Sequence, residues 1–139
     1  ERLVALAVLM PIVASMGGNA GTQTLTVVIR GLGTGIISGA NAWKVVRKEF
    51  LVGSLNGIIW ALAVALVAIV WYQDLALGGV VALAIFVNLV SAALAGVVLP
   101  LALQKAGIDP ALAGGVALTT VTDVVGFFAV LGLAALFLM

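Results

Sequence analysis

The sequence predicts an all-α membrane protein, a polytopic bundle of four transmembrane helices. The 139 residues are 65% hydrophobic and 8% charged, whereas a water-soluble domain has about 25% charged residues. Four stretches with almost no charge each exceed the roughly 20 residues that cross a bilayer core. Residues 55–70, apart from Asn56, and 80–87 are apolar on every side, which excludes the alternating pattern of a membrane β-barrel.

The composition also limits the possible functions. The chain has no Cys and no His, and its net charge is +1. Thiol or imidazole catalysis and soft-metal sites are therefore excluded, and no basic patch is available for a nucleic acid. A two-carboxylate mechanism within one chain is excluded as well, because Asp109 lies about 21 Å from Asp123 along a helix. We predict no enzyme, and only oxygen atoms remain as metal ligands.

The four predicted helices follow from the positions of the charges and caps. They cover residues 3–29, 50–72, 77–104 and 110–138, and together they form one transmembrane domain over 1–139. Asp109 is expected to cap the last helix, with Pro110 at its first position. Pro11 and Pro100 lie inside predicted helices and are expected to bend or break them.

The basic residues predict the orientation. Five of the six lie in the connections 30–49 and 105–109, so these connections are expected on the cytoplasmic side of the plasma membrane. An even number of helices then places Glu1 and Met139 outside. This arrangement predicts at least one further transmembrane helix upstream in a longer parent chain, followed by this multi-pass domain.

Most polar residues of the predicted helices fall on two of them. At 100° per residue they form one stripe on the first helix and one on the last, whereas the second and third helices look like scaffold. The stripe of the first helix consists of Ser15, Asn19, Thr22 and Thr26, with Gly18 beside it, and that of the last consists of Gly115, Thr119, Thr122, Asp123 and Gly126.

Asp123 is predicted to lie near the middle of the membrane. A carboxylate there costs at least about 2.5–3.5 kcal/mol, so a functional role is the first hypothesis. The alternative is a protonated Asp123 that bonds to Asn19 or Thr119 and only holds helices together.

A cation pathway suits this set of hydroxyl, amide and carboxylate oxygens. One carboxylate leaves a divalent ion under-neutralised, but a two-fold axis along the Asp123 face would bring two together. The sequence therefore predicts a homodimer with a pore on its axis. Mg²⁺, which gives up its waters reluctantly, suits so sparse a ligand set.

Several motifs in this order are similar to those of the MgtE-type magnesium channels and transporters. The similarity covers essentially the whole chain. Its motifs are Pro11 with Gly17-Gly18-Asn19-Ala20-Gly21-Thr22-Gln23, Arg47-Lys48-Glu49 before Gly53 and Asn56-Gly57, then Asn88, Gly96, Pro100, Asp109-Pro110-Ala111, and Thr119-Thr120-Val121-Thr122-Asp123-Val124-Val125-Gly126-Phe127.

The resemblance implies a homodimer with five transmembrane helices per subunit, of which this chain resembles the last four. It implies a pore lined by the first and last predicted helices, with Asp123 of both subunits holding a hydrated Mg²⁺ and the segment of Gly17, Gly18 and Asn19 along the path. It also implies cytoplasmic regulatory domains, outside residues 1–139, that sense Mg²⁺.

Two other functions remain open from the residues. In a coupled carrier Asp123 would exchange a proton for the cation, whereas in a membrane anchor Asp123→Asn would affect folding alone. Passive Mg²⁺ uptake driven by the membrane potential is the leading hypothesis. Asp109 is interpreted as a helix cap at the cytoplasmic mouth that could also attract Mg²⁺.

Overall fold

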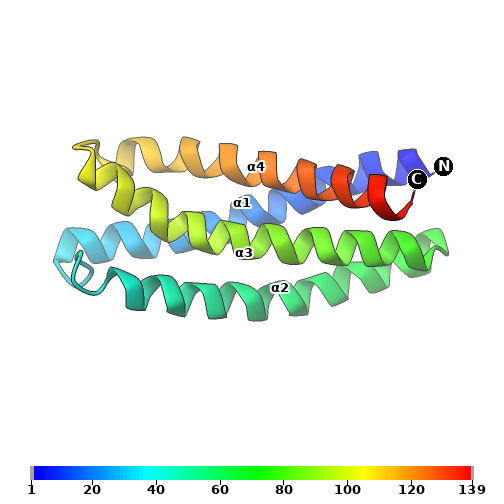
Figure 1. The fold of residues 1–139 in the computed structure, drawn as a ribbon, viewed down its shortest axis with the longest axis horizontal. Helices are drawn as coiled ribbons and strands as arrows, with labels where there is room; N and C mark the ends of the chain where they lie inside the picture. Colours follow the sequence, from blue (N-terminus) through cyan, green and yellow to red (C-terminus); the bar gives the residue numbers. More distant parts are fainter. Residues whose placement is uncertain (1, 139) are drawn as a thin grey trace.

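The computed structural model describes residues 2–138 and confirms an all-helical fold, with no strand among these residues. Four helices follow one another in antiparallel order (Figure 1): α1 (Arg2–Thr34), α2 (Ala42–Tyr72), α3 (Leu75–Lys105) and α4 (Pro110–Phe137). Each of them is long and apolar enough to cross a membrane. The chain is therefore a multi-pass membrane protein whose surroundings include a lipid bilayer.

The helices run beyond the ends that the charges predicted. α1 continues to Thr34 and α2 already begins at Ala42, so the first connection spans only residues 35–41 instead of 30–49. Arg30 and Lys48 belong to helices. Long basic side chains keep their charged ends in the polar interface while the backbone stays helical, and for this reason a charge does not mark where a helix stops.

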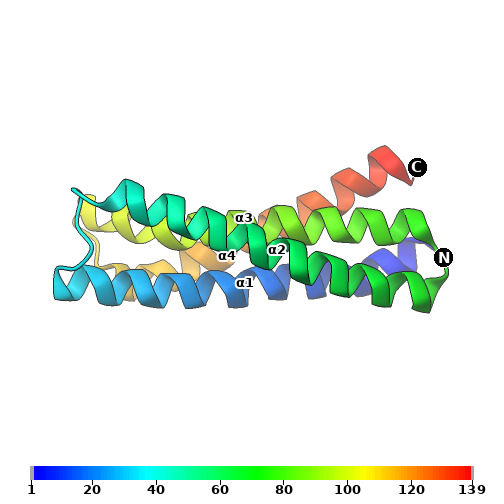
Figure 2. The same ribbon diagram turned by 90° about the horizontal axis from the view of Figure 1, so that it is seen from below.

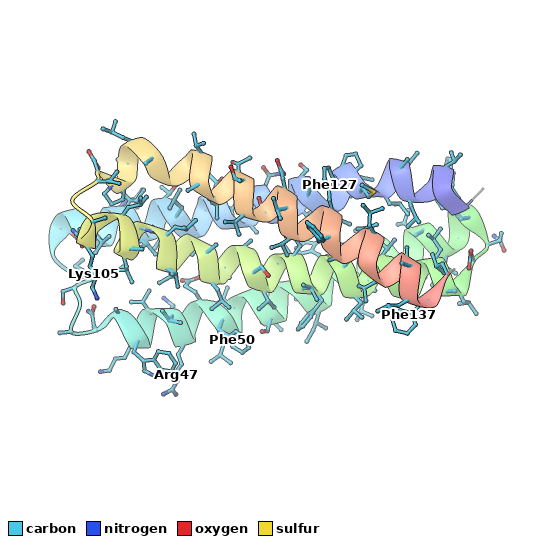
Figure 3. The ribbon with its side chains drawn as sticks, turned by 45° about the horizontal axis from the view of Figure 1, so that its top comes forward. Arg47, Phe50, Lys105, Phe127 and Phe137 are labelled. Carbon is cyan, nitrogen blue, oxygen red and sulfur yellow. The ribbon has the colours of Figure 1, made fainter. Side chains whose placement is uncertain are left out.

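The basic residues gather at one end of the bundle. Arg47 of α2 and Lys105 of α3 lie at the end opposite Phe137 (Figure 3). Arg30, near the end of α1, and Lys44, near the start of α2, belong to the same end. The start of α1 and the end of α4 lie at the other end, whereas Glu1 and Met139 themselves, expected outside the cell, lie outside the described residues.

α3 is the centre of the bundle. It packs against all three other helices, whereas α2 packs extensively on α3 alone (Figure 2). Its inward residues, among them Leu77, Val81, Ile85 and Val97, are fully or almost fully buried. α2 and α4 are similarly apolar but remain largely exposed, so the place of α3 follows from its packing contacts and not from its hydropathy.

Glycines bring α2 close to α3. A Cβ atom at Gly53 would lie 2.6 Å from the Cβ of Ala93, and one at Gly57 would lie 3.0 Å from Cδ1 of Phe86. Small residues permit such close approach between membrane helices, where packing contacts replace the hydrophobic effect as the driving force.

The helix ends and prolines fix how the chain turns. The Asp109 carboxylate accepts a hydrogen bond from the backbone N–H of Ala111 at 3.0 Å and Pro110 begins α4, which confirms the predicted cap. Asp74 caps α3 in the same manner. The helices containing Pro11 and Pro100 continue without interruption, so neither proline breaks its helix.

Candidate functional site

α1 and α4 form an antiparallel pair whose contact line is made largely of small residues. A Cβ atom at Gly18 would lie 3.7 Å from Oγ1 of Thr122, and one at Gly126 would lie 3.2 Å from the Cα of Ala14. Towards the basic end, Gly21 meets Leu118 and Gly114 meets Leu25. These contacts place residue 18 opposite 122 and residue 25 opposite 114.

The predicted polar stripes lie immediately beside this contact line. On both helices each polar residue directly follows a contact residue, for example Asn19 after Gly18 and Asp123 after Thr122. One residue is a rotation of about 100°. In an antiparallel pair the same rotation points to the same side of the two helices. The exposed members that share this face, called here the polar face, are Ser15, Asn19, Thr22, Thr26, Gly115, Thr119 and Asp123.

Asp123 lies at the middle of α4 and near one end of the polar face. It follows Pro110 by 13 residues and precedes Phe137 by 14, so it stands about 20 Å from either end of α4. The register of the two helices places it level with Gly17, between Ser15 and Asn19 of the polar face. Its exposed carboxylate makes no hydrogen bond or ion pair with any described residue, so the bond to Asn19 or Thr119 that the alternative hypothesis required is not made within the subunit.

The hydroxyl groups of the polar face are held by their own helix. Thr22 donates to the carbonyl oxygen of Gly18 at 2.7 Å, and Thr26 donates to that of Thr22 at 2.8 Å. Because the proton points to the backbone, the lone pairs of both oxygens remain available to water or a cation. This arrangement favours a positively charged or hydrated ligand.

Three residues predicted to line a pore lie inside the subunit instead. Gly17, Thr122 and Gly126 are buried between helices, and Thr122 donates its hydroxyl to the carbonyl oxygen of Thr119 at 3.2 Å. Gly18 is half-buried. Periodicity grouped these residues with the exposed ones because the contact line and the polar face are only about 100° apart on each helix.

Asn88 of α3 is the reason that two of these positions are glycines. Its side chain is 0% exposed, and Nδ2 donates to the carbonyl oxygen of Val13 at 2.9 Å. A Cβ atom at Gly17 would overlap Nδ2, and one at Gly126 would lie 3.0 Å from it. The Asn88 amide therefore joins α1, α3 and α4 within a turn of Asp123. In the sequence, Asn88 shows only as a single amide in the middle of a very apolar helix. This pattern predicts a scaffold helix.

The remaining acidic candidate lies at the basic end of the bundle. Asp109 is exposed, and its side chain accepts the capping bond of α4. No group of three or more acidic, His or Cys side chains that could hold a metal occurs among the described residues. Within one subunit Asp123 is thus the single carboxylate of the polar face.

The four long apolar helices and the polar face define a multi-pass integral membrane protein. The chain belongs to the MgtE family of divalent cation transporters, whose family model matches residues 10–133.

Three curated relatives support this assignment, and all three are named magnesium transporter MgtE. The relative from Bacillus subtilis is 36% identical over 138 residues, and the one from Thermus thermophilus is 34% identical over 139 residues. Each of these alignments covers 99% of this chain. The third relative, from Enterococcus faecalis, is 33% identical over 96% of this chain. The chain spans about three tenths of the length of these relatives.

Proposed function

We propose that this chain forms the pore of a Mg²⁺ channel, in which Asp123 of two subunits holds a hydrated Mg²⁺ in the middle of the membrane. The observation that carries this proposal is the exposed carboxylate of Asp123 on the polar face, halfway along α4. The relatives named magnesium transporters support the choice of ion.

A homodimer would complete the site. One carboxylate balances half the charge of a divalent ion, and a two-fold axis facing the polar face supplies the second. Mg²⁺ binds proteins through one or two carboxylates while keeping several waters. Hydroxyls such as that of Thr22 and the amide of Asn19 are well suited to accept or donate hydrogen bonds to those waters.

Passive flow is sufficient for uptake through such a pore. Moving a divalent cation inward across 100 mV, negative inside, is favourable by about 4.6 kcal/mol. The ion therefore needs no coupled substrate. Asp109, at the mouth of the polar face, adds a negative charge where the ion would leave.

We propose that the chain lies in the plasma membrane and that the basic end of the bundle faces the cytoplasm. Regulatory domains of the parent protein would lie on the same side. The support is the set of Arg30, Lys44, Arg47, Lys48 and Lys105 at one end, together with the excess of basic residues in cytoplasmic segments. A cysteine introduced by Ile36→Cys should react with an impermeant reagent from the cytoplasm, and one introduced by Gln73→Cys should react from outside. The reverse labelling would overturn this orientation.

The deciding experiment is voltage-clamped current through the purified full-length protein in a bilayer, under a Mg²⁺ gradient and at two pH values. We expect the current to reverse near the Mg²⁺ equilibrium potential and to ignore a proton gradient. Asp123→Asn should weaken the apparent Mg²⁺ affinity at least about tenfold. Each subunit then loses its carboxylate, which supplies half of the negative charge that neutralises the ion.

Two outcomes would replace the proposal. Transport that is electrically silent, or whose reversal follows the proton gradient, would make Asp123 the proton-exchanging group of a coupled carrier. Unchanged transport in Asp123→Asn would reduce the residue to a packing role.

A further inference from the structure

A second polar compartment lies beside α1, about 120° around the helix from the polar face. It is a cavity of about 210 Å³ between α1 and α2, with α3 as its floor. It exists because α2 packs on α3 and makes little contact with α1. Its polar lining comes from Gln23 and Thr24 of α1 and from Glu49 and Asn56 of α2, and Leu89 and Ala93 of α3 close the bottom.

The polar groups of this cavity are not used by the rest of the subunit. Thr24 bonds to its own helix, but the side chains of Gln23, Glu49 and Asn56 make no hydrogen bond or ion pair with any described residue. Inside a membrane, polar groups must meet protein or water, because each unsatisfied group costs several kcal/mol in lipid. An acyl chain would leave all three of these side chains unsatisfied.

The depth of the cavity makes a lipid headgroup a poor occupant as well. Glu49 is 7 residues from the start of α2 and Asn56 is 14, which places them about 10 Å and 21 Å below that end of the helix. A second cavity of about 390 Å³, which shares Val27 and Glu49 with the first, continues to the basic end, where Arg30 and Lys48 line it. The polar compartment is therefore connected to the basic end of the bundle.

We propose that this cavity is a separate site in each subunit for a hydrated divalent cation, with Glu49 as its charged ligand and Gln23 and Asn56 as hydrogen-bond partners of the ion's waters. Six waters occupy about 180 Å³ at about 30 Å³ each, so a hexahydrated Mg²⁺ fits the cavity. Carboxylate and amide oxygens are the partners that hard cations prefer. Bound there, the ion joins α1, which carries the polar face, to α2, which otherwise hardly touches it.

The first step of the test measures whether the cavity holds water. Residues 1–139 contain no Cys, so a single cysteine introduced there is the sole thiol of this domain. The full-length protein, with any Cys outside the domain replaced by Ser, is studied in lipid nanodiscs. Ala20→Cys lines the cavity, and Ala63→Cys, an exposed position of α2 outside the cavity, is the matched lipid-facing control. Because a thiol reacts as the thiolate, which forms only in water, a charged thiol reagent should modify Ala20→Cys at least about tenfold faster than Ala63→Cys.

The second step adds Mg²⁺ as the probe. Millimolar Mg²⁺ should slow the modification of Ala20→Cys severalfold. Glu49→Gln should abolish this protection, whereas Asp74→Asn, which removes the same charge from the α2–α3 turn and keeps a capping side chain, should retain it. An unchanged modification rate without Mg²⁺ shows that Glu49→Gln is still folded.

A variant that strengthens Mg²⁺ binding gives a clearer result than one that weakens it, because misfolding cannot explain stronger binding. Asn56→Asp adds a second carboxylate to the cavity, so protection should begin at a lower Mg²⁺ concentration. Protection that persists in Asp123→Asn shows that this site is distinct from the polar face, and the result does not depend on whether Asp123 conducts an ion. An unreactive Ala20→Cys, which would mean that lipid or another helix fills the cavity, overturns the proposal, and so does a reaction rate that ignores Mg²⁺.

Discussion

The amide of Asn88 lies where α1, α3 and α4 meet, against the bare backbones of Gly17 and Gly126. Its Oδ1 atom has no hydrogen-bond partner among the described residues. The position of Asp123, one turn away on α4, therefore depends on a polar contact that the polar face itself does not contain.

Gly17→Ala tests this packing. The added methyl group would overlap Asn88 Nδ2, and over-packing a well-filled core typically costs about 1–3 kcal/mol. We expect the variant to lower the free energy of unfolding in a detergent titration by this amount.

Gly79→Ala is the matched control for that titration. A Cβ atom at Gly79 meets no atom within 4 Å, and replacing a helical Gly with Ala stabilises by up to about 1 kcal/mol. Equal effects of the two substitutions would contradict the role assigned to Asn88.

Among single residues, the sequence draws attention to those whose chemistry is unusual in a membrane. It does not reveal residues whose roles depend on the helices packed beside them. Asp123 and the cap at Asp109 stand out because a charge is costly in lipid and because Asp-Pro is a helix-start signal. The roles of Asn88, Gln23 and Glu49 depend on which helices lie beside them. Periodicity within one helix carries no such information.

At the scale of the helix, α4 begins with the Asp109 cap, whose charge we propose to act at the mouth of the polar face. The two roles separate by substitution. Asp109→Ala removes the side-chain acceptor for the Ala111 N–H and should lower the free energy of unfolding by about 1 kcal/mol. Asp109→Asn keeps the acceptor and should stay within about 0.5 kcal/mol of the wild type.

Current through the same two variants shows whether the charge matters. If Asp109 attracts cations electrostatically, both substitutions should lower the current at low ionic strength, and salt should reduce the difference from the wild type. A reduced current in Asp109→Ala alone would assign Asp109 to capping only.

Helix number and type were predictable because each stretch is long and almost free of charge, but the ends were not. α2 begins at Ala42 because Asn41 ends a tight turn, in which its side chain bonds the N–H of Ser38 at 2.8 Å and the carbonyl oxygen of Ile36 at 2.7 Å. The charges at Lys44 and Lys48, used to delimit the helix, lie within its first turns. The helix ends here follow turn chemistry instead of hydropathy.

At the scale of the whole molecule, the polar face is a surface that a second copy is expected to cover. A cysteine introduced by Thr119→Cys, on that face, should form a covalent dimer with a short bifunctional thiol reagent in membranes. Ala63→Cys, on exposed α2, should remain monomeric under the same conditions. A dimer through Ala63→Cys alone would move the interface to α2 and separate the two Asp123 carboxylates.

The arrangement of the bundle also bears on its synthesis. α1 and α2 are made before α3, yet they hardly touch, and both wait for α3 to supply their partner surface. Until α3 arrives, the side of α1 that carries Val13 and Gly17 has no packed neighbour. We therefore expect α1 and α2 to remain beside the insertion machinery until α3 is delivered, so that α1 enters the bilayer together with the apolar helix that covers its buried side.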